Sequence, residues 1–394
     1  MALSEYYTPT HVYFGKGAEL EAGRLLKEAE LDRVLVHFGS GSVKRSGLLE
    51  RVEKTLKEHD ITFIELGGVQ PNPRITLVRK GVELCRENNL KAVLAIGGGS
   101  VIDSAKAIGY GAFNGGDPWD FYSFKRKPQG SIPIATILTL SATGSEMSSS
   151  SVITNEEEGL KRGVNTNYCR PLFSLMNPEL TYTVSPYQTS SGTVDIMMHT
   201  LERFFHNGET LAITDDLSLS LIKEVMRSGK IALENPTDYS ARASLMWASS
   251  LSHNDLMNVG NANRGDWACH QLEHELSGLY DVAHGAGLAA IWSSWARYVM
   301  DANYERFITL GKKVFDLKST GDDEKDALNA IEHMDEYFRS INMPTNLKEL
   351  GVEPDDEDVR KLAESCSFFG KRTVGNIKAL GIDDMIAIYN LARS

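Results

Sequence analysis

Histidines and one carboxylate in the second half of the chain stand at spacings that suit metal binding. Asp195 and His199 are four residues apart, so on a helix both side chains lie on one face and can bind one ion. Farther on, His270 and His274 repeat this spacing, and His284 follows in the run Asp-Val-Ala-His-Gly. Imidazoles together with a carboxylate suit a divalent transition ion such as Zn²⁺ or Fe²⁺. The pair of Asp195 and His199 alone is more often an ordinary surface or helix-face pair, and His270 and His274 alone could equally be one. Only the joint occurrence of these residues favours a metal site.

The other histidines and the cysteines show no pattern that predicts a role. The remaining histidines are scattered along the chain: His11, His37, His59, His206, His253 and His333. The four cysteines form no Cys-x-x-Cys pair, which predicts reduced, packed thiols and neither disulfides nor a thiolate zinc site: Cys85, Cys169, Cys269 and Cys366.

A glycine-rich turn in the first half has the composition of a phosphate-binding site. The run Ala-Ile-Gly-Gly-Gly-Ser-Val-Ile leads from a predicted strand into a predicted helix, with Gly98, Gly99 and Ser100 at the turn. Glycines let the backbone approach a ligand, and the first amides of the helix with its dipole favour a pyrophosphate. A tight turn commonly needs one glycine, so three in a row favour the phosphate interpretation over the structural one. The standard Rossmann spacing Gly-x-Gly-x-x-Gly is absent.

A second small loop bears on the choice of dinucleotide. The loop that follows the first predicted strand consists of Gly39, Ser40, Gly41 and Ser42. In dinucleotide folds an acidic residue that binds the adenosine ribose repels a 2′-phosphate, and this loop has none. Hydroxyls, amides and the nearby Lys44 or Arg45 suit that phosphate, so the loop favours NADP(H) over NAD(H).

Short apolar runs alternate with amphipathic runs in the first half. Strands are predicted at residues 34–38, 61–66, 92–96 and 132–138, and helices at residues 48–57, 75–87 and 101–113. Strands of this length separated by helices are typical of β-α-β units, which form a parallel sheet covered on both faces. The first half is therefore predicted to be an α/β, Rossmann-like domain.

Beyond about residue 185 the strand signal disappears and helical patterns follow one another. Helices are predicted at residues 189–205, 217–233, 241–257 and 266–276, with more toward the end of the chain. Pro186 disfavours helix in the residue before it and suits the first helical turn. We therefore predict an α/β dinucleotide-binding domain at residues 1–184 and an all-helical metal-binding and substrate domain at residues 185–394.

Length and charge limit the possible partners. For 394 residues, two domains are the natural expectation, and the formal net charge of −12 argues against a nucleic-acid partner. The start of the sequence lacks the pattern of a secretory signal, and no stretch approaches about 18 uninterrupted apolar residues, so a cytoplasmic protein with no membrane partner is expected.

Together the motifs resemble the iron-containing (group III) alcohol dehydrogenase family, most closely its branch of NADPH-dependent aldehyde reductases and butanol dehydrogenases. The matching segments follow the family's order over nearly the whole chain: GGGSVIDSAK at 97–106, LSATGSE at 140–146, NPELTYTVSP at 177–186, DIMMHTLE at 195–202 and WACHQLEHELSGLYDVAHGAG at 267–287. The resemblance implies an NAD(P)-dependent alcohol dehydrogenase or aldehyde reductase that acts on a small alcohol or aldehyde. It also implies the two-domain architecture of dehydroquinate synthase and a homodimer.

The resemblance assigns roles to the residues of both halves. The family's metal ligands fall on Asp195, His199, His270 and His284, and His274 resembles an additional histidine close to substrate and cofactor. The implied cofactor contacts are Gly98, Gly99 and Ser100 for the pyrophosphate, Asp103 beside the nicotinamide, Asn72 as a further cofactor contact, Thr139 and Thr143 for the adenosine and nicotinamide, Lys161 near phosphate or ribose, and Gly39 to Ser42 as the loop of the NADPH-using branch.

Two positions depart from the family's pattern. Asn177 stands where the family usually has aspartate, and residues 148–151 are four consecutive serines. Other activities on the same architecture remain open, namely a glycerol dehydrogenase-like or dehydroquinate synthase-like enzyme, and so does a nucleotide- and metal-binding protein without turnover. The Asp195 and His199 pair argues against the synthase.

Overall fold

A computed structural model describes residues 3–261 and 264–393. Its contacts divide the chain into two compact units. One, here called the sheet unit, is Tyr7–Val184, and the other, the helical unit, begins at Ser185 and includes the N-terminal segment through Tyr6. The assignment of this N-terminal segment differs from the prediction, which placed it in the first domain. Its Ser4 Oγ accepts a hydrogen bond of 3.1 Å from the amide of Gly260 in the helical unit.

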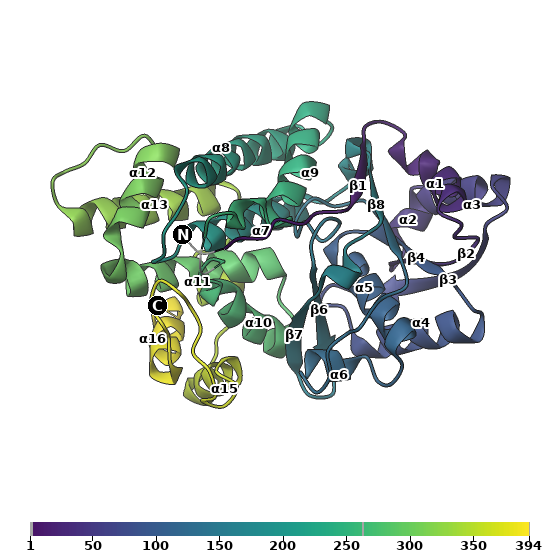
Figure 1. The fold of residues 1–394 in the computed structure, drawn as a ribbon. Coiled ribbons are helices and arrows are strands. Elements are labelled where there is room, and N and C mark those ends of the chain that lie inside the picture. Colours follow the sequence, from purple (N-terminus) through teal and green to yellow (C-terminus); the bar gives the residue numbers. More distant parts are fainter. Residues whose placement is uncertain (1–2, 262–263, 394) are drawn as a thin grey trace. The chain divides into compact units, whose positions relative to one another are not determined.

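Six strands of the sheet unit form a parallel sheet in the order β1-β8-β5-β4-β2-β3, and β6 and β7 form a separate antiparallel pair (Figure 1). The strands are β1 (His11–Phe14), β2 (Arg33–Gly39), β3 (Thr62–Val69), β4 (Ala92–Gly97), β5 (Ile134–Leu138), β6 (Ser150–Asn155), β7 (Leu160–Asn165) and β8 (Phe173–Met176). The helices are α1 (Ala22–Glu28), α2 (Ser42–Arg45), α3 (Leu48–Glu58), α4 (Ile75–Glu87), α5 (Gly99–Asn114) and α6 (Trp119–Tyr122). The predicted α/β class is confirmed.

Successive residues of β2 serve the two faces of the sheet, as strand geometry requires. Val34 and Val36 pack with Leu26 of α1 and Val52 of α3 in one hydrophobic cluster. His37 faces the opposite side, where its Nε2 lies 2.8 Å from Ser104 Oγ of α5. Because both faces are covered, the central strands are buried throughout and read in sequence as continuous apolar runs.

The carboxyl ends of β2, β4 and β5 bring the predicted loops together at one edge of the sheet. Neighbouring parallel strands end on the same side, and β4 lies between β2 and β5. The connection from β2 leads to β3 on one side, and the connection from β4 leads to β5 on the other side. The sheet therefore has a topological switch point between β2 and β4. Ligands of open α/β sheets commonly bind at such a point.

Glycines in the loop after β4 allow this loop to lie close to the loop after β5. A Cβ on Gly99 would lie 2.3 Å from Thr143 Oγ1, and one on Gly98 would lie 3.1 Å from Leu140 Cβ. A Cβ on Gly39 would be in ordinary contact with Val101, at 3.9 Å. Packing therefore requires at least Gly99, whatever the loop binds.

The sequence patterns did not indicate β1, β6, β7 or β8. The serine run continues into β6, where Ser150 pairs with Asn165 and Thr154 pairs with Lys161 in an antiparallel ladder. Serines carry no apolar alternation, so the periodicity that marks a strand was missing. β1 and β8 have only four residues each, too few for a clear period.

The helical unit is built around α7, which is buried along most of its length. Its longer helices are α7 (Pro186–Phe204), α8 (Ala212–Glu234), α9 (Tyr239–His253), α10 (Ala268–Tyr280), α11 (His284–Val299), α12 (Tyr304–Val314), α13 (Asp323–Ser340), α15 (Asp356–Cys366) and α16 (Ile382–Ala392), with α14 (Leu347–Leu350) as a single turn. Helix α9 ends four residues before its predicted end, and Asp255 then adopts a left-handed φ of 72°.

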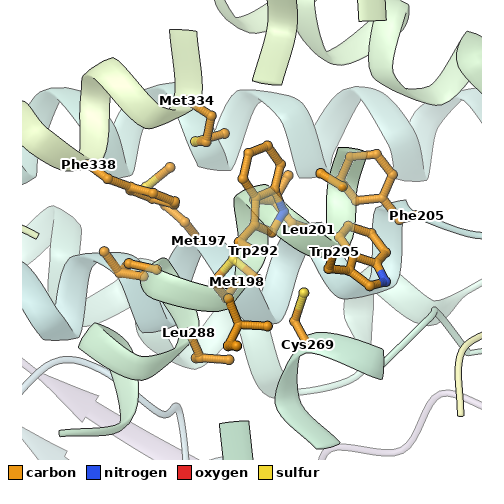
Figure 2. Close-up of a cluster of buried hydrophobic side chains, with 14 of the residues drawn as sticks. Met197, Met198, Leu201, Phe205, Cys269, Leu288, Trp292, Trp295, Met334 and Phe338 are labelled. Atoms are coloured by element: carbon orange, nitrogen blue, oxygen red, sulfur yellow. The ribbon is translucent and has the colours of Figure 1, made fainter. Parts of the chain in front are cut away.

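The two sides of α7 have different neighbours. Met197, Met198 and Leu201 lie in a core formed with aromatic side chains such as Trp292 and Phe338 (Figure 2). Asp195 and His199 lie on another side of the helix. The four cysteines are unbridged and buried, as predicted. Among the described residues, no helix combines the length and apolar character needed to cross a membrane.

The burial of His37 predicts a pH-dependent stability. Burial lowers the pKa of His37 to about 4, against an ordinary value of about 6.5 in the unfolded chain. Between these two pH values only the unfolded state takes up the proton. The contribution of the neutral His37 to the free energy of unfolding is therefore fully present above pH 6.5 and is lost as the pH falls toward 4. From pH 7 to pH 5 the loss is about 2 kcal/mol.

We expect the His37→Asn variant to lose correspondingly less stability between these two pH values than the wild type. Urea unfolding of the metal-free protein at both pH values measures the difference, and His11→Asn, at an exposed position, is the control. Equal losses in wild type and His37→Asn would contradict the assignment.

The contact between Gly99 and Thr143 predicts a second outcome. Gly99→Ala should lower the free energy of unfolding by about 1 to 3 kcal/mol, because the added methyl overlaps the threonine side chain. Thr143→Ala in the same chain should recover part of this loss by removing the two nearest atoms. Gly163→Ala is the matched control, since its Cβ would meet nothing nearer than 3.6 Å. An unchanged stability of Gly99→Ala would refute the close packing.

Candidate metal centre

Three helices of the helical unit supply the residues of the candidate centre. Asp195 and His199 lie on α7, His270 and His274 lie on α10, and His284 is the first residue of α11. Helix α7 begins at Pro186, three residues before the predicted helix, and the side chain of Ser185 caps the amide of Gln188.

Glycines at the start of α11 let the three helices approach one another. A Cβ on Gly285 would lie 2.0 Å from the carbonyl oxygen of Ser191 on α7, and one on Gly287 would lie 2.9 Å from Glu273 on α10. Any larger residue would force α11 away from its neighbours. The Gly-Ala-Gly that follows His284 thus places this histidine against both helices.

The candidate donor atoms gather in a buried space. Those of Asp195, His199 and His270 all lie within 4.8 Å of one another, and all three side chains are buried. His284 Nε2 lies 3.7 Å from Asp195 Oδ1. A metal with nitrogen and oxygen ligands at about 2.0–2.2 Å needs its donors about this close, after a small contraction.

Each of the three imidazoles uses its Nδ1 in a hydrogen bond, which leaves Nε2 for the centre. His199 Nδ1 lies 2.9 Å from the carbonyl oxygen of Asp195, and His270 Nδ1 lies 2.9 Å from Glu202 Oε1. His284 Nδ1 bonds to Glu273 Oε2. These acceptors place the proton on Nδ1, so Nε2 carries the lone pair that a metal requires.

Two polar atoms in the centre support metal binding directly. Asp195 Oδ1 and His270 Nε2 are buried and have no hydrogen-bond partner among the described residues. Asp195 Oδ1 is 3.1 Å from His199 Nδ1, but that nitrogen donates its proton to the backbone carbonyl. Unpaired buried polar atoms cost about 1–3 kcal/mol each, and coordination to a cation satisfies both. The residues therefore fit a divalent metal.

The ionisation of these side chains also fits ligation. Burial alone would raise the pKa of Asp195, but the neighbouring imidazoles, His199 first, outweigh it and hold the pKa well below its usual range. Burial, followed by the charges of His199 and His284, lowers the pKa of His270 well below its ordinary value. An ionised carboxylate and a neutral imidazole are the forms that bind metals.

His274 stands at the margin of the centre. Its ring centroid lies 5.6 Å from that of His284 and 6.4 Å from that of His270. His284 has a possible ligand atom within 4.8 Å of those of Glu273 and His274, and its Nε2 also lies 3.7 Å from Asp195 Oδ1. Since Glu273 already accepts the proton on His284 Nδ1, we place His284 with Asp195 and leave His274 outside the ligand set.

Sequence reasoning missed several residues that contact the centre. Glu202 and Glu273 bond to two of the imidazoles, and the ring centroid of His253 lies 4.1 Å from that of His199. Trp267 packs beside His270, with ring centroids 5.2 Å apart. Glu202 stands three residues after His199, on the same helix face, and that spacing was a usable signal. His253 is isolated in sequence and gave none.

The remaining predicted cofactor residues lie in the sheet unit. Asp103 of α5 already accepts hydrogen bonds from Ser145 Oγ at 2.6 Å and from the amide of Val152 at 2.9 Å. It therefore joins α5 to the connection between β5 and β6 and to β6 itself. Burial raises the pKa of Asp103, and the charges of Lys106 and of Lys161 on β7 oppose this shift. Asn72 is buried with a φ of 54° in the connection that follows β3.

The Gly39 to Ser42 loop has an ionic contact that the sequence did not reveal. Lys44 Nζ lies 3.0 Å from Glu65 Oε2 of β3 and 5.0 Å from the centre of the Phe38 ring. An acidic side chain thus lies near this loop, supplied by the neighbouring strand. The positive charge that Lys44 offers to a ligand is correspondingly smaller.

Comparison with known proteins extends over the whole chain. The family model "Iron-containing alcohol dehydrogenase" matches residues 9–178, and "Fe-containing alcohol dehydrogenase family, C-terminal" matches residues 189–393. NADH-dependent butanol dehydrogenase A of Clostridium acetobutylicum is 42% identical over 98% of both chains. The NADPH-dependent aldehyde reductase of Escherichia coli is 32% identical, also over 98% of both.

A solved structure agrees with this relationship. The crystal structure of NADH-dependent butanol dehydrogenase A from Thermotoga maritima superposes with a TM-score of 0.96 at 36% identity, covering 100% of this chain and 99% of that one. With family models that match both halves of the chain and a buried cluster of Asp195, His199 and His270, the chain belongs to the iron-containing alcohol dehydrogenase family.

Proposed function

We propose that this protein reduces small aldehydes with a reduced nicotinamide dinucleotide, and oxidises small primary alcohols in the reverse direction. The proposal is carried by the buried cluster of Asp195, His199 and His270, in which two donor atoms have no hydrogen-bond partner among the described residues. The names of the clostridial and Escherichia coli relatives, a butanol dehydrogenase and an aldehyde reductase, support the substrate class.

Asp195, His199, His270 and His284 would hold one divalent ion, Fe²⁺ or Zn²⁺. Such an ion supplies a Lewis acid that polarises the oxygen of the carbonyl or alcohol group. The protein contributes a rigid, mostly buried donor set and neutral imidazoles directed by their own hydrogen bonds.

His274 is the proposed proton donor and acceptor for the substrate oxygen. Reduction of a carbonyl adds a hydride to carbon and requires a proton on oxygen. An imidazole has an ordinary pKa near neutrality and can hold or release that proton at physiological pH. Its place beside His270 and His284, outside the proposed ligand set, suits this role.

The dinucleotide is proposed to bind the sheet unit at the switch point between β2 and β4. The first amides of α5, after Gly98, have no intrahelical acceptors and suit the pyrophosphate. Thr139 and Thr143 follow the neighbouring strand β5, and Asn72 and Lys161 are the further proposed contacts.

The proposed preference is for NADPH over NADH, from the loop Gly39 to Ser42 without an acidic residue. The ion pair of Lys44 with Glu65 predicts that this preference is modest. A homodimer in the cytoplasm is the proposed state, following the family resemblance.

The central test is an anaerobic reduction assay with butanal. Metal-stripped protein reloaded with Fe²⁺ or Zn²⁺ should oxidise NADPH, and NADH more weakly, as followed by their absorbance. Asp195→Ala should fall to background because it removes the one anionic ligand of the proposed set. Asp238→Ala is the control, since this residue caps α9 and should cost only about 1 kcal/mol of stability.

Other results of this assay separate the alternatives. Tight NADPH binding with no oxidation by any aldehyde would favour a binding protein without turnover. Activity that persists in Asp195→Ala, or without metal, would overturn the proposed centre. A lower KM for NADH than for NADPH would reverse the proposed preference and leave the rest intact.

A second test concerns His274. His274→Ala should lower kcat by about 100-fold or more, the usual contribution of a general acid or base, with metal content near that of the wild type. His333→Ala, on α13, is the control. A loss of bound metal in His274→Ala, measured by elemental analysis, would instead make His274 a ligand.

A further inference from the structure

Two buried glutamates contact the imidazoles of the metal centre from the side opposite to the metal-facing nitrogens. Glu202, on α7, and Glu273, on α10, are fully shielded from solvent. Neither belongs to the proposed ligand set. Each accepts a hydrogen bond from the Nδ1 of one histidine of the proposed ligand set, Glu202 from His270 and Glu273 from His284.

Glu202 fixes both the main chain and the ring of His270. Its Oε1 accepts hydrogen bonds from the amide of His270 and from Nδ1 of the same residue, each at 2.9 Å. The two bonds together set the rotation of the side chain and leave Nε2, which has no hydrogen-bond partner among the described residues, available to a metal. The other oxygen, Oε2, is buried with no hydrogen-bond partner among the described residues.

Glu273 holds His284 in a similar way. Its Oε2 bonds to His284 Nδ1, and its Oε1 accepts a hydrogen bond from Ser277 Oγ one turn later on α10. Gly287 leaves the space for this side chain, since a Cβ there would lie 2.9 Å from Glu273 Oε1. Both oxygens of Glu273 are therefore used before any ion is considered.

An uncompensated buried carboxylate is costly, and Glu202 has no cationic hydrogen-bond partner to offset this cost. A divalent cation bound to Nε2 of His270 would offset this cost, because its charge would lie across the imidazole ring from the carboxylate. In return the carboxylate makes the imidazole a stronger donor. The third imidazole, of His199, has a neutral carbonyl in this position.

We propose that Glu202 and Glu273 are positioning residues that orient His270 and His284 and strengthen their bonds to the metal. The inference rests on the proposed metal centre and adds to it which residues determine its affinity. The two glutamates touch neither metal nor substrate in this proposal and act only through the histidines.

The test measures metal binding without reference to turnover. The full-length protein, stripped of metal, is titrated with Co²⁺ in competition with a chelator, and the visible spectrum of the bound ion is recorded. Glu202→Gln and Glu273→Gln should each weaken Co²⁺ binding by about 10- to 100-fold and alter the spectrum. The melting temperature of the metal-free variants should stay near that of the wild type, whereas the rise in Tm on adding metal should shrink.

Glu275→Gln is the matched control. Glu275 is also a buried glutamate of α10, but its Oε2 accepts a hydrogen bond from Ser365 Oγ. Wild-type affinity in this variant, with weakened binding in the other two, supports the proposal. Wild-type affinity in Glu202→Gln and Glu273→Gln, or equal weakening in all three, overturns it.

A second measurement does not depend on whether the variants fold. In the Zn²⁺-loaded wild type, the Nδ1 protons of His270 and His284 should give low-field, slowly exchanging NMR signals, because carboxylates hold them. Their absence would overturn the proposal. Failure of the wild type to bind Co²⁺ would refute the proposed metal centre as well. If the wild type binds Co²⁺ and reduces butanal, and the glutamine variants bind Co²⁺ with unchanged affinity, only the positioning roles are refuted.

Discussion

The structure of the helical unit depends on keeping the carboxylate of Asp195 and the imidazoles of His199 and His270 buried close together, with the half-buried His284 beside them. Asp195 can stay ionised in this environment because the surrounding imidazoles, His199 first, hold its pKa well below the usual range despite burial. Such a group is stable only if the helices carrying it cannot drift apart. The close approach of α11 to α7 and α10, allowed by Gly285 and Gly287, meets that condition. The apolar side chains on the other side of α7 fix the helix in place (Figure 2).

The sheet unit illustrates how packing and binding can require the same residue. Gly99 has no room for a side chain beside Thr143, so its presence alone does not distinguish a phosphate loop from a crowded turn. The polar residues that follow on α5 connect it to the serine run. Lys106 is buried and donates hydrogen bonds to Ser148 O at 2.9 Å and to Ser150 O at 2.7 Å. The serine run, which departs from the family's usual pattern, thereby has a structural role.

The sequence predicted those parts whose signals are local and periodic. Helix α4 was predicted at the residues where it lies, and β2 and β4 were within one residue at each end, since buried strands and amphipathic helices have strong periods. The spacing of Asp195 and His199 on one helix was equally readable. The contacts of Glu273 with His284 and of Lys44 with Glu65 join separate elements, so no spacing reveals them. The β6 and β7 pair was missed because its serines, Lys161 and Arg162 conceal the alternation of apolar residues.

The position of Cys269 affects which metals the centre can accept. It precedes His270 in the chain, yet its side chain belongs to the apolar core (Figure 2). Burial, with the nearby carboxylates of Glu202 and Asp266, raises the pKa of this thiol well above its ordinary value. The donor set is thus limited to nitrogen and oxygen, which disfavours soft ions such as Cu⁺ that seek thiolates. The same placement shields the sulfur from peroxide, so oxidative damage at the bound metal has no thiol within the ligand set to attack.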